Sequence, residues 1–96
     1  MAQTAYEQYM LELINAARLD PAAAAALYGV NLGSISAASK QPLAGNQLLT
    51  LAAEDHSQWM LDTDTFSHTG AGGSDPGDRM SDAGYAFTGA WTWGEN

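Results

Sequence analysis

Hydrophobic residues recur every three or four positions in two long stretches of the chain, which is the spacing of an amphipathic helix. In residues 4–18 the positions on one face are Tyr6, Tyr9, Met10, Leu13, Ile14 and Ala17. In residues 46–62 they are Leu49, Ala52, Ala53, His56, Trp59 and Met60. Thr4 and Glu7 have the spacing of a capping box, and Asn46 is a good N-cap residue. These patterns predict a helix in each stretch.

Two shorter helices are predicted by the residues that start and stop them. Asp20 can cap a helix that has Pro21 at its first position and Gly29 just past its end. The same order of an Asp-Pro start and a Gly stop recurs over residues 75–84. Residues 31–45 are small and polar without a clear period, so we expect them to form a long surface loop.

The aromatic residues determine where a strand and a core are expected. Residues 85–93, YAFTGAWTW, alternate aromatic and small side chains, which predicts a strand or an extended edge. Much of the 46% hydrophobic content is alanine, which buries little area per residue. A core in this single small domain would therefore depend on Trp59, Trp91 and Trp93, together with the tyrosines and the leucines.

Charge and composition narrow the classes of partner. Three basic and eleven acidic residues give a net charge of −8, which argues against nucleic acid and anionic membranes as partners. The alanine-rich stretch over 22–30 is too short to span a bilayer, and the first residues lack the features of a secretory signal. No cysteine is present, so disulfides and thiolate metal sites are excluded.

Three titratable residues are candidates for chemistry. His68 lies in a polar, glycine-rich loop, where an imidazole can reach solvent, a proton or a metal, although a lone loop histidine is more often only a surface residue. Glu95 follows two tryptophans and a glycine, a setting that suits a metal ligand or a perturbed acid. His56 shares the apolar helix face, which predicts a buried histidine with a hydrogen-bonded ring.

Five short segments occur in an order that resembles a known family. They are LINAAR, PLAGNQLLTLAAEDHSQWM, FSHTG, DRMSDAGY and WGEN, and the resemblance that they carry covers the chain from about Leu11 to Asn96. This order closely resembles the bacterial branch of the CAP superfamily, also called SCP-like. The superfamily includes cysteine-rich secretory proteins, antigen 5 and plant pathogenesis-related proteins.

The resemblance implies an α+β fold, an α-β-α sandwich with a central sheet between helices. Family members continue past the Gly-Glu-Asn motif with a further helix, more strands, and a second glutamate and histidine. The resemblance therefore implies that residues 1–96 form a single partial domain, the N-terminal half. We expect these residues to be mainly helical with one or two short strands. A half domain would self-associate, repack as a helical bundle or be the ordered part of a longer molecule.

The resemblance also assigns roles to individual residues. Asn15 and Arg18 would belong to the framework of the first helix, as would His56 to its own helix. His68 and Glu95 would be two of the four His/Glu residues of the family's cavity and would ligate a divalent metal such as zinc. Two ligands completed by water should bind zinc weakly.

Three functions remain open from the sequence. The resemblance favours a secreted, extracellular or periplasmic, non-enzymatic module that binds a divalent metal, a small molecule or an unidentified protein. A metal-dependent, peptidase-like hydrolase is the first alternative, but the sequence supplies no nucleophile beside a base. A helical structural or interaction domain without a site is the second.

Overall fold

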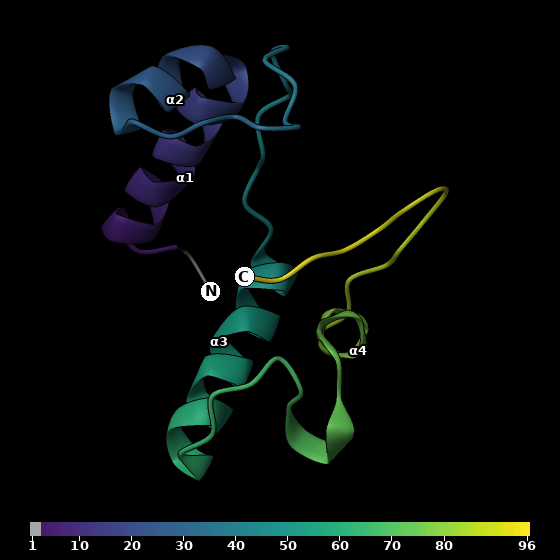
Figure 1. The fold of residues 1–96 in the computed structure, drawn as a ribbon. Helices are drawn as coiled ribbons and strands as arrows, with labels where there is room; N and C mark the ends of the chain where they lie inside the picture. Colours follow the sequence, from purple (N-terminus) through teal and green to yellow (C-terminus); the bar gives the residue numbers. More distant parts are fainter. Residues whose placement is uncertain (1–2) are drawn as a thin grey trace. The chain divides into compact units, whose positions relative to one another are not determined.

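The computed structural model describes residues 3–96 of the chain. These residues form two compact units, residues 3–45 and residues 46–96 (Figure 1). The first unit contains helices α1 and α2, and the second contains helices α3 and α4 with a short 3-10 helix, η1, between them. Each unit is described by itself.

Helix α1, Ala5–Leu19, begins at the capping box that the sequence predicts. The Glu7 amide donates to Thr4 Oγ1 at 3.1 Å, and the Thr4 amide donates to Glu7 Oε1 at 2.8 Å. These bonds satisfy two of the amide groups that a helix start leaves without a partner. The backbone bond from Thr4 also lowers the pKa of Glu7, because it favours the ionised carboxylate.

Helix α2, Pro21–Tyr28, starts and stops at the predicted residues. Asp20 ends α1 and caps α2, and its carboxylate accepts from the Ala23 amide at 3.1 Å. Gly29 follows the helix in a left-handed conformation with φ 65°, which a glycine adopts without steric cost. The two helices pack against each other in this unit.

Two residues of α1 hold the loop that follows α2. The Asn15 side chain donates to the Leu43 carbonyl at 2.8 Å and accepts from the Leu43 amide at 2.6 Å. Arg18 donates through Nε to the Gln41 carbonyl at 2.8 Å, and the Lys40 amide donates to the Arg18 carbonyl at 2.8 Å. The framework role that the resemblance gives to these two side chains therefore has a physical basis, because they replace backbone pairing in a loop without regular structure.

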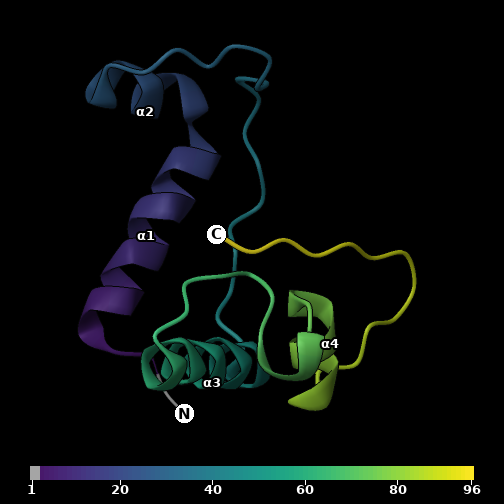
Figure 2. The same ribbon diagram turned by 60° about the horizontal axis from the view of Figure 1, so that its bottom comes forward.

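In the second unit, helix α3, Gln47–Thr63, begins at Asn46. The Asn46 side chain accepts from the amides of Leu48 at 2.9 Å and Leu49 at 3.1 Å, as expected of an N-cap. The 3-10 helix η1, Ala71–Gly73, and helix α4, Pro76–Asp82, follow along the chain. Figure 2 shows that the loop after α3 folds back over this helix before it reaches α4.

The predictions of an α-β-α sandwich and of a strand over residues 85–93 are wrong, because the structure contains no strand anywhere in residues 3–96. A strand needs a partner with which to share a hydrogen-bond ladder. Within residues 3–96 no other strand is present to pair with residues 85–93, and Gly89 bends the segment with φ 66°. Its aromatic rings instead contact one another: the centroids of Tyr85 and Phe87 are 5.2 Å apart, and those of Phe87 and Trp91 are 4.4 Å apart.

The core is also smaller than the sequence suggests. Among the residues of α3, only Ala52 and His56 are buried. Trp91 and Trp93 remain exposed, so the expectation that the tryptophans build a core is not met for this pair. Trp93 instead lies against Gly77 of α4, whose missing side chain leaves room for the indole ring. The polar contacts around His56 and Arg79 therefore matter more to this unit than in a protein with a large apolar interior.

A candidate ligand site around His68 and Glu95

His68 lies in the loop between α3 and η1, and a buried histidine of α3 anchors that loop. His56 is only 5% exposed, and its Nε2 donates to the Ser67 carbonyl at 2.7 Å. The Ser67 hydroxyl in turn accepts from the Thr69 amide at 3.0 Å. The sequence-based interpretation of His56 as a buried residue with a hydrogen-bonded ring is confirmed. These bonds fix the backbone on both sides of His68, whose side chain is 63% exposed.

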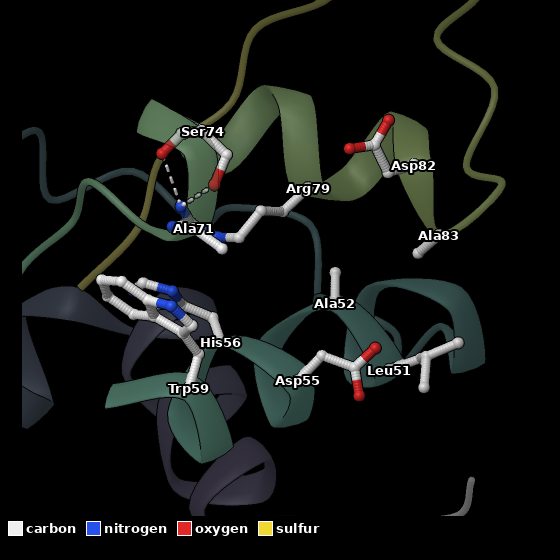
Figure 3. A pocket seen from close by; sticks show the side chains of 10 residues that line it. All are labelled: Leu51, Ala52, Asp55, His56, Trp59, Ala71, Ser74, Arg79, Asp82 and Ala83. Atoms are coloured by element: carbon white, nitrogen blue, oxygen red, sulfur yellow. Dashed lines mark hydrogen bonds between the residues drawn. The ribbon is translucent and has the colours of Figure 1, made fainter. Parts of the chain in front are cut away.

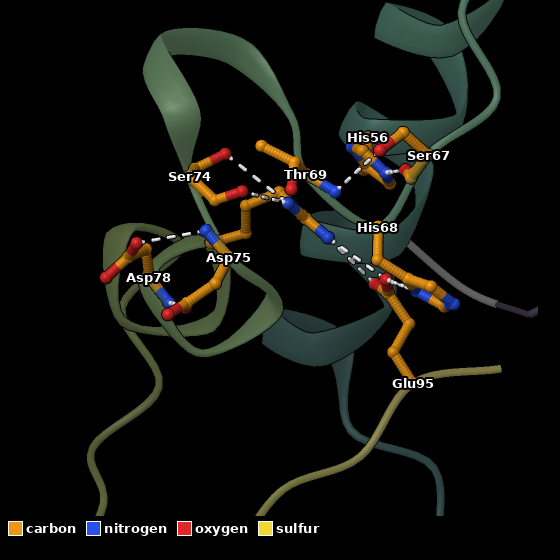
Figure 4. A network of polar contacts seen from close by, with 9 residues as sticks. His56, Ser67, His68, Thr69, Ser74, Asp75, Asp78 and Glu95 are labelled. Carbon is orange, nitrogen blue, oxygen red and sulfur yellow. Dashed lines mark hydrogen bonds and ion pairs between the residues drawn. The ribbon is translucent and has the colours of Figure 1, made fainter.

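The structure brings His68 and Glu95 together although 27 residues separate them. Nδ1 of His68 lies 2.7 Å from Oε1 of Glu95 (Figure 4). An ionised carboxylate only accepts hydrogen bonds, so Nδ1 must carry the proton in this contact. A neutral imidazole with its proton on Nδ1 leaves Nε2 as a free acceptor. In its neutral form the imidazole therefore presents one unprotonated nitrogen and is oriented by a carboxylate.

Arg79 of α4 holds the other side of Glu95. Its Nη2 donates to Oε1 at 3.1 Å and to Oε2 at 3.0 Å of the Glu95 carboxylate. Its Nη1 donates to the Ser74 carbonyl at 2.9 Å. The Arg79 side chain is 11% exposed and that of Glu95 is 25% exposed, so the ion pair is shielded from much of the solvent. The sequence reasoning missed Arg79, and its signal was its rarity, because only three residues of the chain are basic.

Opposing effects set the pKa of Glu95. Burial by itself would raise the pKa, because it disfavours the charged carboxylate. The hydrogen bonds from His68 and Arg79, together with the positive charge of Arg79, lower it by more. The net pKa is below the ordinary value of 4.5, so Glu95 is ionised at neutral pH and remains an acceptor for His68.

Two cavities adjoin this cluster, and His56 lines both. One cavity, of about 280 Å³, is bordered by His68 and Glu95 and has Met60 and Phe66 in its apolar wall. The other, of about 350 Å³, lies between α3 and α4 and includes Arg79 (Figure 3). Nδ1 of His56 is buried and has no hydrogen-bond partner among residues 3–96. The first cavity is the one that a ligand of His68 would enter.

The cluster does not by itself fit a metal centre. A zinc site is normally built from three or four protein ligands. Residues 3–96 contain no group of three or more His, Cys, Asp or Glu side chains that could hold a metal ion. Both oxygens of Glu95 already accept hydrogen bonds from Arg79, so within the His68–Glu95 pair the ligand atom without a hydrogen-bond partner among residues 3–96 is Nε2 of His68. Metal ligation by His68 and Glu95 together stays a prediction.

The chain matches the model of a known protein family. The family described as "CAP: Cysteine-rich secretory protein family" has a model that matches residues 11–96. The chain belongs to the CAP family. Comparison with curated proteins finds no match, and comparison with solved structures finds none either.

Membership of the CAP family confirms the family resemblance seen in the five segments, while the bacterial branch stays a prediction. The match includes the Gly-Glu-Asn motif that carries Glu95. The family's name refers to cysteines that this chain lacks altogether. In residues 3–96 we find no helix with the length and hydropathy needed to cross a membrane. Because the chain has no cysteine, the site of this CAP chain depends on its histidine, glutamate and arginine side chains.

Proposed function

We propose that this CAP chain is an extracellular, non-enzymatic binding module whose ligand enters the cavity beside His68 and Glu95. The observation that carries the proposal is the 2.7 Å contact between the two side chains, which both line the cavity. The contact fixes the imidazole and leaves Nε2 without a hydrogen-bond partner among residues 3–96. A small ligand with a hydrogen-bond donor, or a divalent cation, would meet this nitrogen first. Apolar atoms of Met60 and Phe66 would contact the rest of a small molecule.

The surroundings of His68 favour binding over catalysis. A histidine paired with a carboxylate can act as a general base, but covalent hydrolysis also needs a nucleophile within hydrogen-bond reach. Among residues 3–96 no serine, threonine or tyrosine hydroxyl is hydrogen-bonded to His68. A peptidase-like hydrolase remains the alternative. Turnover of a peptide library that His68→Ala abolishes would favour it.

A divalent cation should bind weakly at this site. One imidazole nitrogen with water in the remaining positions gives far less affinity than a complete set of protein ligands. We expect zinc to bind no tighter than the high micromolar range at neutral pH. Binding should weaken on acidification, because a protonated imidazole has no free electron pair for the ion.

The test combines calorimetry with NMR on the whole chain. Zinc chloride is titrated into the wild-type chain, His68→Ala and Glu12→Gln, the last as a control that removes an exposed carboxylate of α1. A set of small polar fragments is then screened by changes in the amide NMR spectrum. We expect weak binding that His68→Ala removes and Glu12→Gln retains. Nanomolar zinc affinity, or responses that His68→Ala leaves unchanged, would contradict the proposed site and favour a helical domain without one.

A further inference from the structure

The carboxylate of Glu95 is engaged from two directions, and this sets what it can bind. Oε1 accepts from Nδ1 of His68 at 2.7 Å and from Nη2 of Arg79 at 3.1 Å, while Oε2 accepts from the same Nη2 at 3.0 Å. A carboxylate offers about four lone-pair positions, so these three bonds leave little capacity for a metal ion. The remaining position lies on a carboxylate whose two oxygens both touch a guanidinium.

The position of Arg79 is itself fixed. Its Nη1 donates to the Ser74 carbonyl at 2.9 Å and lies 3.4 Å from the Ser74 hydroxyl. A side chain attached to Gly70 would lie 3.0 Å from this Nη1, which shows how closely the loop backbone approaches the guanidinium. With 11% of its side chain exposed, Arg79 cannot swing into solvent without breaking these contacts. The charge of a guanidinium is permanent under ordinary conditions, so it cannot be neutralised to admit a cation.

We propose that Arg79 is a specificity-determining residue that reserves Glu95 for orienting His68 and keeps divalent cations off the carboxylate. A zinc ion bound to an oxygen would lie at about 2.0 to 2.2 Å from it. Nη2 of Arg79 is only 3.0 Å from Oε2, so the ion and the guanidinium would repel each other at short range. The inference rests on the proposed function, because it takes His68 to be the residue that meets the ligand.

The proposed role of Arg79 predicts that zinc affinity changes in an unusual direction when this residue is replaced. A residue that only supports the fold would weaken every interaction at the site when it is replaced. A residue that excludes cations would instead free the Glu95 carboxylate to ligate a cation when its charge is lost. We therefore expect Arg79→Met to bind zinc at least about tenfold more tightly than the wild-type chain, a conservative gain for a charge repulsion at this range near a protein surface.

The experiment compares zinc binding by calorimetry in the full chain and its variants. Arg79→Met is the main variant, Arg79→Lys retains the charge, and Arg79→Met with Glu95→Gln removes the released carboxylate. Circular dichroism checks that each variant keeps its helices. We expect tighter binding in Arg79→Met, wild-type affinity in Arg79→Lys, and loss of the gain in the double variant. Unchanged or weaker zinc binding in a folded Arg79→Met chain overturns the proposal.

A measurement on the wild-type chain keeps the proposal testable if Arg79→Met does not fold. Zinc is added while NMR follows the ring nitrogens of His68 and the carboxyl carbon of Glu95. We expect the Nε2 signal of His68 to shift and the Glu95 carbon to stay in place. A shift of the Glu95 carbon that tracks zinc occupancy overturns the proposal, because it identifies the carboxylate as a ligand. Failure of zinc to move the His68 signals contradicts the proposed cation contact instead, so the two failures are read from different nuclei.

Discussion

Replacing Gly70 by alanine should destabilise the 46–96 unit by filling a space that three polar groups surround. A methyl group built on Gly70 would lie 2.9 Å from Nδ1 of His56, 2.9 Å from the Ser74 hydroxyl and 3.0 Å from Nη1 of Arg79. The backbone at Gly70, with φ −113°, is open to alanine, so the cost comes from crowding alone. None of the three groups can withdraw freely, since His56 is buried and Arg79 holds both Ser74 and Glu95.

The loss in the free energy of unfolding can be estimated from the known cost of crowding such a site. Overpacking a tight site typically costs roughly 1 to 3 kcal/mol, and we expect Gly70→Ala to fall in this range. Gly94→Ala is the matched control, because nothing lies within 4 Å of a methyl group there. The measurement is urea unfolding followed by circular dichroism, with Gly94→Ala expected within about 0.5 kcal/mol of wild type. Equal stability of the two variants would refute the crowding of Gly70 and the rigidity of the Arg79 contacts.

Three further variants test contacts in both units. Because the pKa of Glu95 is lowered in the folded chain, its stabilising effect should be complete above the ordinary value of 4.5 and disappear as the pH falls through the lower folded pKa. The stability difference between wild type and Glu95→Gln should shrink on acidification, and a constant difference would contradict this. Asn15→Ala should cost roughly 1 to 2 kcal/mol by removing two bonds to Leu43 and should speed hydrogen exchange of the Leu43 amide. In Gly77→Ala a methyl group 2.5 Å from Nε1 of Trp93 should displace the indole, and an unshifted indole N–H signal in NMR would count against that contact.

The helices were predictable because their signals are local. Asp20 serves as the cap of α2, and Asn46 as that of α3, because a side-chain oxygen and the amides it accepts from are only two or three residues apart. The start of α4 is marked by equally local signals, with Asp75 as the N-cap and Pro76 at the start of the helix. Such contacts depend on a few neighbouring residues, so the sequence alone identifies them.

The prediction of a strand over residues 85–93 was wrong because a strand depends on contacts that are not local. Alternation of aromatic and small residues shows that a segment is able to be a strand, but a ladder also requires a partner that the segment itself does not specify. In residues 3–96 the aromatic rings contact each other, and Trp93 lies against Gly77 instead. The family resemblance suffered from the same limit, since the sandwich that it implies has no strand in the part of the chain that the structure describes.

At the candidate site the sequence motifs identified two residues but not the contacts that these residues make. His68 and Glu95 were chosen for their residue types and their place in the family's motifs, and the structure does bring them into contact. Their relationship to each other could not be read from those motifs. Whether a glutamate is a ligand or an orienting partner depends on what else its oxygens touch, and here they touch Arg79. In a chain with eleven acidic and three basic residues, most carboxylates have no cation to pair with. Among residues 3–96 the carboxylate that pairs with an arginine is that of Glu95, beside the candidate histidine. The chemistry of the site therefore follows from a residue of α4 that lies outside the FSHTG and WGEN segments.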